Sequence, residues 1–144
     1  MDSLTPAEAS LFDPSIIDMR TFSQILEMDD GEVRDFSREI VSDFIHSFTF
    51  WNKSIDEAIH NDSLKSLKAL GSEFGGSART LGLVKISDTA NKIENLASKK
   101  DEFGQKPLED EDEIMRRIVD QVERIKVHHE EAEAMFRRFY PIEQ

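Results

Sequence analysis

The residue that could most readily do chemistry is Ser72. It lies within residues 70–83, three residues before the adjacent glycines Gly75 and Gly76. A serine hydroxyl is a weak nucleophile unless a base lies next to it, and no histidine is predicted beside Ser72. Gly75 and Gly76 each cost about 0.8–1 kcal/mol relative to alanine inside a helix. Such a cost is usually compensated by the close approach of another backbone or a partner, which a side chain would block. The segment therefore predicts a docking surface more readily than a catalytic centre.

The helical period places this surface on one side of its helix. At about 100° per residue, a strip nearly bare of side chains lies roughly opposite the apolar stripe that runs from Leu67 through Phe74 to Leu81. The predicted strip comprises Ser72, Gly75, Gly76 and Arg79.

Composition limits the classes of protein to which this chain can belong. Its 144 residues suit one domain with a real core. Eighteen basic and 30 acidic residues give a net charge of −12, which argues against nucleic acid and anionic lipid as partners. No apolar run is long enough to span a bilayer, and no secretory signal is apparent. The absence of cysteine suits a reducing compartment, so we expect a cytoplasmic location, with the nucleus as an alternative.

Apolar residues recur three or four apart along almost the whole chain, which predicts helices and no strand. Asp13 and Pro14 are expected to open the first helix, and Gly82 is expected to end the third. The expected helices cover about 14–28, 32–60, 64–81, 84–99 and a long segment after 109. Short connections between the last four favour an all-α, antiparallel four-helix bundle with an additional short N-terminal helix at one end or side. Residues 1–12 are expected to be a flexible tail and 13–144 a single helical domain.

The N-terminal helix has two apolar faces instead of one. Its first face would join the core, and its second carries Ile25 and Met28, with Thr21 beside them. An apolar face left in water suggests a partner surface. The alternative is that this helix is sandwiched between other elements, and the residues alone leave the two open.

Several short segments together resemble the histidine phosphotransfer (HPt) family, in particular its fungal single-domain phosphorelay proteins. The resemblance covers about residues 15–140 and is carried by 22–30, 35–37, 70–71, 76–77, 80–83, 92–96 and 139–140. It implies the same four-helix bundle and an N-terminal helix that helps bind the receiver domain of a response regulator. It also implies that the helix over 64–81 occupies the place of the helix that carries the phosphorylated histidine.

The departures from the family pattern fall where the phosphotransfer chemistry would occur. Ser72 stands at the position of the histidine, Gly75 at that of a lysine three residues later, and Gly76 matches the glycine that follows. Imidazole, with a pKa of about 6.5, can accept a phosphoryl group near neutral pH, whereas an unassisted hydroxyl cannot do so readily. Asp43 and Ser47 stand where relatives often carry glutamines. The resemblance therefore implies a pseudo-HPt protein that has lost its phosphoacceptor.

Helix faces and resemblance together predict binding residues but no catalytic residue. The expected partner is a receiver domain, a hybrid histidine kinase, or both, bound by a monomer, with no nucleic acid, membrane or cofactor involved. The predicted partner-binding residues are Thr21, Ile25, Met28, Asp43, Ser47, Ser72, Gly75, Gly76 and Arg79.

No other group offers an evident replacement for the missing histidine. His46 and His60 fall outside the apolar stripe of their helix, while His129 lies on the stripe of the last helix and is expected to be packed. The chain contains no Glu-x-x-His motif for a di-iron site, and the acidic run 109–113 is expected to be solvated, so no metal site is predicted.

Two alternatives to the pseudo-HPt interpretation remain open. In one, the chain is an altered form of an active phosphorelay intermediate whose phosphoacceptor histidine has been replaced. In the other, it is a helical scaffold repurposed for an unrelated partner.

Overall fold

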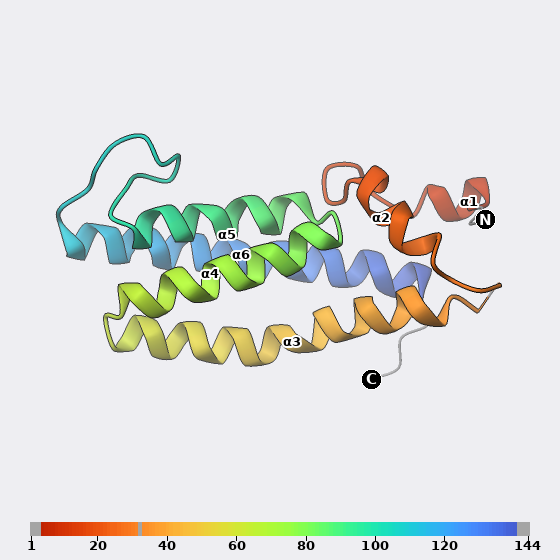
Figure 1. Cartoon of the computed structure of the whole chain (residues 1–144), viewed down its shortest axis with the longest axis horizontal. Coiled ribbons are helices and arrows are strands. Elements are labelled where there is room, and N and C mark those ends of the chain that lie inside the picture. Colours follow the sequence, from red (N-terminus) through yellow and green to blue (C-terminus); the bar gives the residue numbers. More distant parts are fainter. Residues whose placement is uncertain (1–3, 32, 141–144) are drawn as a thin grey trace.

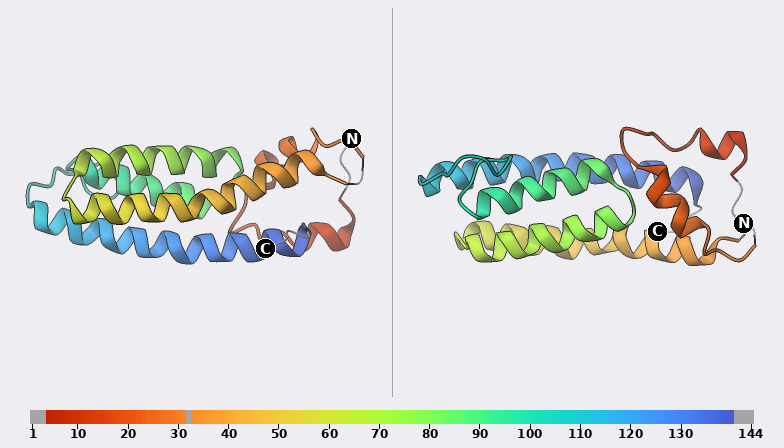
Figure 2. Two further views of the ribbon diagram at one scale, coloured as in Figure 1. Left: turned by 90° about the horizontal axis from the view of Figure 1, so that it is seen from below. Right: turned by 45° about the horizontal axis from the view of Figure 1, so that its top comes forward.

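Four long helices lie side by side and alternate in direction, as the spacing of apolar residues predicts (Figure 1). In the computed structural model, which describes residues 4–31 and 33–140, the bundle is preceded by two short helices at one end. The bundle helices are α3 (Asp35–His60), α4 (Leu64–Thr80), α5 (Val84–Ala97) and α6 (Glu111–Phe139). The further views in Figure 2 show the same arrangement, with α1 (Pro6–Ala9) and α2 (Met19–Leu26) gathered at the end where α3 begins and α6 finishes. The predicted fold class is confirmed.

Aromatic side chains fill the middle of the bundle between α3, α4 and α6. Phe74 of α4 stacks on Trp51 and Phe44 of α3, with ring centroids 4.5 and 5.2 Å apart. The indole nitrogen of Trp51 donates a hydrogen bond of 3.0 Å to the carbonyl oxygen of Leu70. Each fully buried side chain of this size stabilises the fold by about 1.5–3 kcal/mol. These contacts fix how α3 and α4 lie against one another.

The predicted ends of α4 agree with the structure. The Ser63 hydroxyl caps its start by accepting a hydrogen bond from the backbone N–H of Ser66. The helix stops just before Gly82, whose φ of +78° is a conformation that favours glycine. A Cβ on Gly82 would also lie 2.7 Å from the carbonyl oxygen of Asp18. The turn between α4 and α5 therefore requires glycine both for its own backbone and for the segment packed on it.

The expected start of the N-terminal helix at Asp13–Pro14 is wrong. The backbone N–H of Asp18 donates to the carbonyl oxygen of Gly82 at 2.7 Å, and Val84 donates to Ile16 at 3.2 Å. This pairing with the α4–α5 turn holds the segment out of helical geometry. Helix α2 begins after it, with the Asp18 carboxylate accepting from the N–H of Arg20.

Residues 4–12 differ from the expected flexible tail, and residues 1–3 lie outside the described part of the chain. Thr5 and Glu8 form a reciprocal capping box around α1. Phe12 is buried, with its ring centroid 4.8 Å from that of Phe139. Glu8 also accepts a hydrogen bond of 2.7 Å from Arg34, which is the main reason that its pKa is lowered to about 2. The N-terminal segment is thus attached to both α3 and α6.

A hydrogen-bond chain at one end of the bundle joins the residue after α6 to the first turn of α3 and to the segment after α2. The Tyr140 hydroxyl donates to Ser37 Oγ at 2.6 Å, and Ser37 Oγ donates to Asp29 Oδ2 at 2.6 Å. The other carboxylate oxygen of Asp29 accepts from the backbone N–H of Ser37 at 2.7 Å. Asp29 therefore supplies a cap for α3 that the preceding Arg34 does not provide.

We predict that Ser37→Ala lowers the free energy of unfolding by about 1–3 kcal/mol, because it removes the hydroxyl that accepts from Tyr140 and donates to Asp29. Chemical denaturation followed by circular dichroism measures this loss. Tyr140→Phe should cost less, since it removes one hydrogen bond and leaves the contact between Ser37 and Asp29. Equal costs for the two substitutions would contradict this account of the chain.

Candidate partner-binding surface

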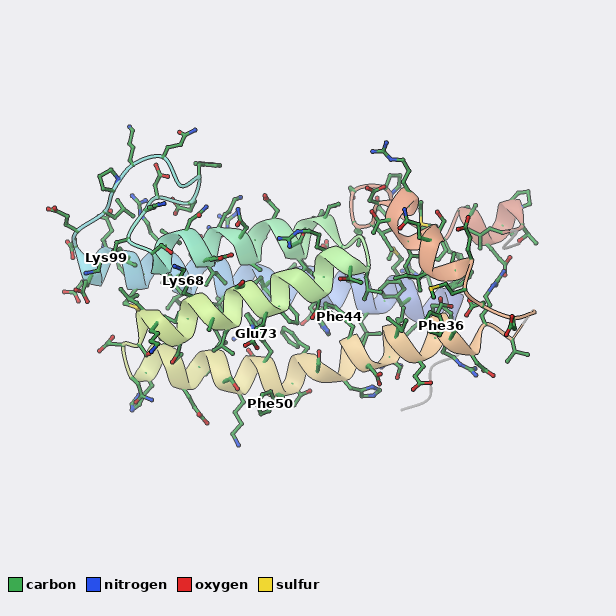
Figure 3. The ribbon with its side chains drawn as sticks, viewed as in Figure 1. Phe36, Phe44, Phe50, Lys68, Glu73 and Lys99 are labelled. Atoms are coloured by element: carbon green, nitrogen blue, oxygen red, sulfur yellow. The ribbon has the colours of Figure 1, made fainter. Side chains whose placement is uncertain are left out.

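The outer side of α4 carries Ser72 and Gly76, one helical turn apart and open to solvent. Ser72 is exposed, and a Cβ built on Gly76 would meet no atom within 4 Å. Lys68 and Glu73 mark the same helix in Figure 3, where Glu73 lies on the side of α4 that faces α3. The predicted bare strip is therefore present at these two positions.

Gly75, in contrast, does not belong to the exposed strip. It is buried against α5, and a Cβ there would lie 3.1 Å from the Cβ of Ala90. Gly71, one turn earlier, faces the same helix, since its Cβ would lie 3.1 Å from the carbonyl oxygen of Ala90. Gly75 is rotated about 60° from Ser72, which is enough to turn it from solvent to the α4–α5 contact. Its role is close helix packing, so the expectation that it lines the surface is wrong.

Asp43 and Ser47 face a groove between α3 and the second half of α4. The groove has a volume of about 350 Å³. Its other lining residues are Ile40, Phe44, Ser77, Thr80 and Leu81. Asp43 and Ser47 therefore lie level with residues one to two turns beyond Ser72, on the α3 side of the strip.

Arg79 lies in a separate depression on the α5 side of α4. This depression has a volume of about 660 Å³ and is lined by Arg79, Val84, Lys85, Ser87, Asp88 and Asn91. The predicted residues of the bundle thus divide into an α3 side and an α5 side, with Ser72 and Gly76 between them.

Of the three residues predicted in and just after α2, only one is well exposed. Met28 is 62% exposed, but Ile25 is 8% exposed and belongs to the core. Thr21 is half-buried, and its Cβ would lie 3.1 Å from a Cβ on Gly82. The expectation that Ile25 is open to a partner is wrong, because both apolar faces of this short helix contact the protein. The sandwiched alternative holds for Ile25.

None of the four histidines approaches the role of a phosphoacceptor on this surface. His129 is 4% exposed and stacks on Phe48 with centroids 3.9 Å apart, as predicted for a packed histidine. Burial lowers the pKa of His129. His46 is held on its own helix by the carbonyl oxygen of Ser42. All four lie on α3 or α6, and α4 has none.

Residues 4–31 and 33–140 contain no candidate metal site and no candidate membrane span. No group of three or more histidine or acidic side chains there could hold a metal ion. No helix among these residues is both long and apolar enough to cross a membrane. The acidic run before α6 instead caps that helix, with Asp110 accepting from the N–H groups of Asp112 and Glu113.

Two exposed aromatic residues on α3 were not predicted as surface residues. Phe50 is 76% exposed at the edge of α3 away from α4, and Phe36 is 41% exposed in the first turn (Figure 3). The sequence signal was available for Phe50, because it falls outside the stripe of Phe48, Trp51 and Ile55. Phe36 could not be placed in this way, since its exposure depends on where α2 ends.

Comparison with known proteins supports an HPt-like protein. The chain is 29% identical over 128 residues to multistep phosphorelay regulator 1 of Schizosaccharomyces pombe, covering 89% of this chain and 43% of that protein. It is 34% identical over 89 residues to phosphorelay intermediate protein YPD1 of Candida albicans, covering 62% of this chain and 48% of that protein. The chain thus spans less than half the length of these curated relatives. No family model matches it.

The two adjacent glycines of α4 should respond in opposite ways to the same substitution. Gly76→Leu should raise the free energy of unfolding by about 0.5–1 kcal/mol, because leucine is the better helix former and the position is open. Gly75→Leu should lower it by about 1–3 kcal/mol, because the side chain would separate α4 from Ala90. Urea denaturation of the two variants measures both effects, and a stabilised Gly75→Leu would contradict the close packing of α4 and α5.

Proposed function

We propose that this chain is a pseudo-HPt protein of a two-component phosphorelay. It docks receiver domains or hybrid histidine kinases without accepting a phosphoryl group at residue 72. The observation that supports this function best is the exposed Ser72 beside the open Gly76, on a bundle helix that has no histidine. The resemblance places the phosphoacceptor histidine of active relatives at this position.

The chemistry available around Ser72 is poorly suited to phosphotransfer. Transfer from an aspartyl phosphate needs a nucleophile that is available near pH 7, and a hydroxyl requires an adjacent base to become one. The family's lysine is replaced by Gly75, which is closed by Ala90 at 3.1 Å. A cation that would pair with the phosphate is therefore missing, and the packing of α5 leaves no room to restore it without a shift.

The surface itself remains suited to binding. An open glycine next to an exposed hydroxyl lets another backbone approach α4 closely. The groove beside Asp43 and Ser47 adds apolar residues such as Ile40 and Leu81 at its base. Exposed Met28 extends the apolar area at the end of α2. Together these features favour an adaptor that competes with active phosphorelay proteins for the same partners.

An active carrier in altered form is the second candidate. The observation in its favour is that both relatives are named as phosphorelay proteins, one as a regulator and one as an intermediate. On this hypothesis, residue 72 of the unaltered protein would be histidine, and the remaining surface would be competent for transfer.

We predict that Gly76→Gln weakens binding to a receiver domain at least tenfold while the bundle stays folded, because the side chain covers the open strip. Isothermal titration calorimetry against a panel of receiver domains measures the affinity, and circular dichroism checks the fold. Val127→Gln, which replaces another exposed residue on α6, is the matched control and should bind normally. Unchanged affinity of a folded Gly76→Gln variant for the receiver domain would count against the proposed docking surface.

Incubation with a phosphorylated receiver separates the two phosphorelay candidates. The chain with Ser72 should acquire no acid-labile phosphate, and Ser72→His should acquire little, because the family's lysine three residues later is still replaced by the packed Gly75. Radiolabel retained on the protein before and after acid treatment measures the transfer. Efficient transfer by Ser72→His would show that the other departures are incidental and would favour the altered carrier.

A further inference from the structure

Charge is distributed very unevenly between the α4–α5 hairpin and the rest of the molecule. Residues 64–100 contain seven of the 18 Lys and Arg but three of the 30 Asp and Glu. The hairpin therefore carries a net charge of +4 and the remaining residues a net charge of −16, which together give the total of −12. A chain that is strongly acidic as a whole thus has one basic side, and this side includes Ser72 and Gly76.

The cations of the hairpin are accessible to solvent. Lys65, Lys68, Arg79, Lys99 and Lys100 are exposed, and Lys85 and Lys92 are half-buried. One of the three carboxylates, Asp88, is already paired with Lys92 at 3.4 Å. The basic side chains therefore dominate the field that a partner would meet on this face.

The depression between α4 and α5 concentrates suitable donors in one place. Arg79 and Lys85 line it together with the Ser87 hydroxyl and the Asn91 amide, and the one carboxylate in the lining, that of Asp88, is paired with Lys92 at 3.4 Å. Lys85 also contacts Glu131 of α6 at 3.5 Å. Among the described residues no ion pair joins Arg79 to a carboxylate, so its guanidinium can engage an acidic group of a partner. A guanidinium binds a carboxylate through two parallel hydrogen bonds, which gives direction as well as affinity.

We propose that the α4–α5 face docks an acidic surface of the partner protein, with a partner carboxylate seated between Arg79 and Lys85. This inference rests on the proposed function and specifies the charge of the docking partner. The basic face would orient the partner over Ser72 and Gly76, since the acidic remainder of the molecule repels the same surface. Such complementarity acts mainly on the association rate and on the choice of partner.

Charge distribution favours a protein over other anionic partners. Duplex nucleic acid carries a charge about every 1.7 Å and would extend past the hairpin onto the acidic remainder. A bilayer with anionic headgroups would meet the same repulsion. A second copy of this chain is disfavoured because each copy carries a net charge of −12. An acidic patch on a protein can meet the basic side chains of the hairpin without extending onto the acidic remainder.

The test is a charge reversal at the depression, compared with an equal reversal elsewhere. Arg79→Glu/Lys85→Glu should weaken binding to the tightest receiver of the panel about tenfold at 50 mM NaCl and about twofold at 500 mM, where salt screens the charges. Arg116→Glu/Arg124→Glu on exposed positions of α6 makes the same change in net charge and should leave the affinity within about twofold. Equal losses for both pairs would overturn the proposal, because net charge alone would then explain them.

Two further measurements distinguish this inference from the proposed function. If Gly76→Gln weakens receiver binding but the reversal at Arg79 and Lys85 does not, docking stands and the acidic-partner inference is overturned. If no receiver binds, the full 15N-labelled chain is titrated with a hexaglutamate peptide and, separately, with a DNA oligonucleotide of equal charge. Changes in backbone amide chemical shifts support the inference if the peptide causes them mainly between Arg79 and Asn91 and if they disappear at 500 mM NaCl. Scattered shifts, or a stronger response to the oligonucleotide, overturn it.

Discussion

The close approach of α4 and α5 is the constraint on which the rest of this structure depends. Gly71 and Gly75 face Ala90, and any side chain at these two positions would lie within 3.1 Å of its backbone oxygen or Cβ. Because the helices meet this closely, the other side of α4 is turned outward, with Ser72 and Gly76 in solvent. The same contact fills the space around residue 75, the position that corresponds by resemblance to a lysine in the HPt family. One pair of small residues thus permits the close packing of α4 on α5.

A second set of contacts positions α2 at the end of the bundle. The segment before α2 is hydrogen-bonded to the α4–α5 turn through Gly82. Asp29, which follows α2, caps the start of α3 through Ser37. Tyr140 completes this network from the end of α6. Several segments that carry the family resemblance therefore meet at one end of the molecule.

The functional proposals follow from what these contacts leave exposed. An open strip at Ser72 and Gly76 lies between an apolar groove on the α3 side and a basic depression on the α5 side. Neither side supplies an imidazole, and the packed His129 is 4% exposed. On the proposed function, an open surface without a histidine suits competitive binding better than group transfer. The charge contrast between the hairpin and the remaining residues adds a means of choosing the partner.

The sequence by itself determined the long helices, their antiparallel order and the packing of His129. These features depend on local periodicity, on caps such as Ser63 and on the conformational freedom of Gly82, which neighbouring residues reveal. It also placed Ser72 and Gly76 on an outward side, because a rotation about one helix axis suffices for that. Tertiary structure decided the roles of Gly75 and Ile25. Each of these residues lies less than a quarter turn around its helix axis from an exposed position. Tertiary structure decided the placement of residues 4–12 as well, since the ring of Phe12 packs against Phe22 and Phe139 from helices distant in the sequence. Burial depends on which neighbour covers each side of a helix, and a periodic pattern does not identify that neighbour.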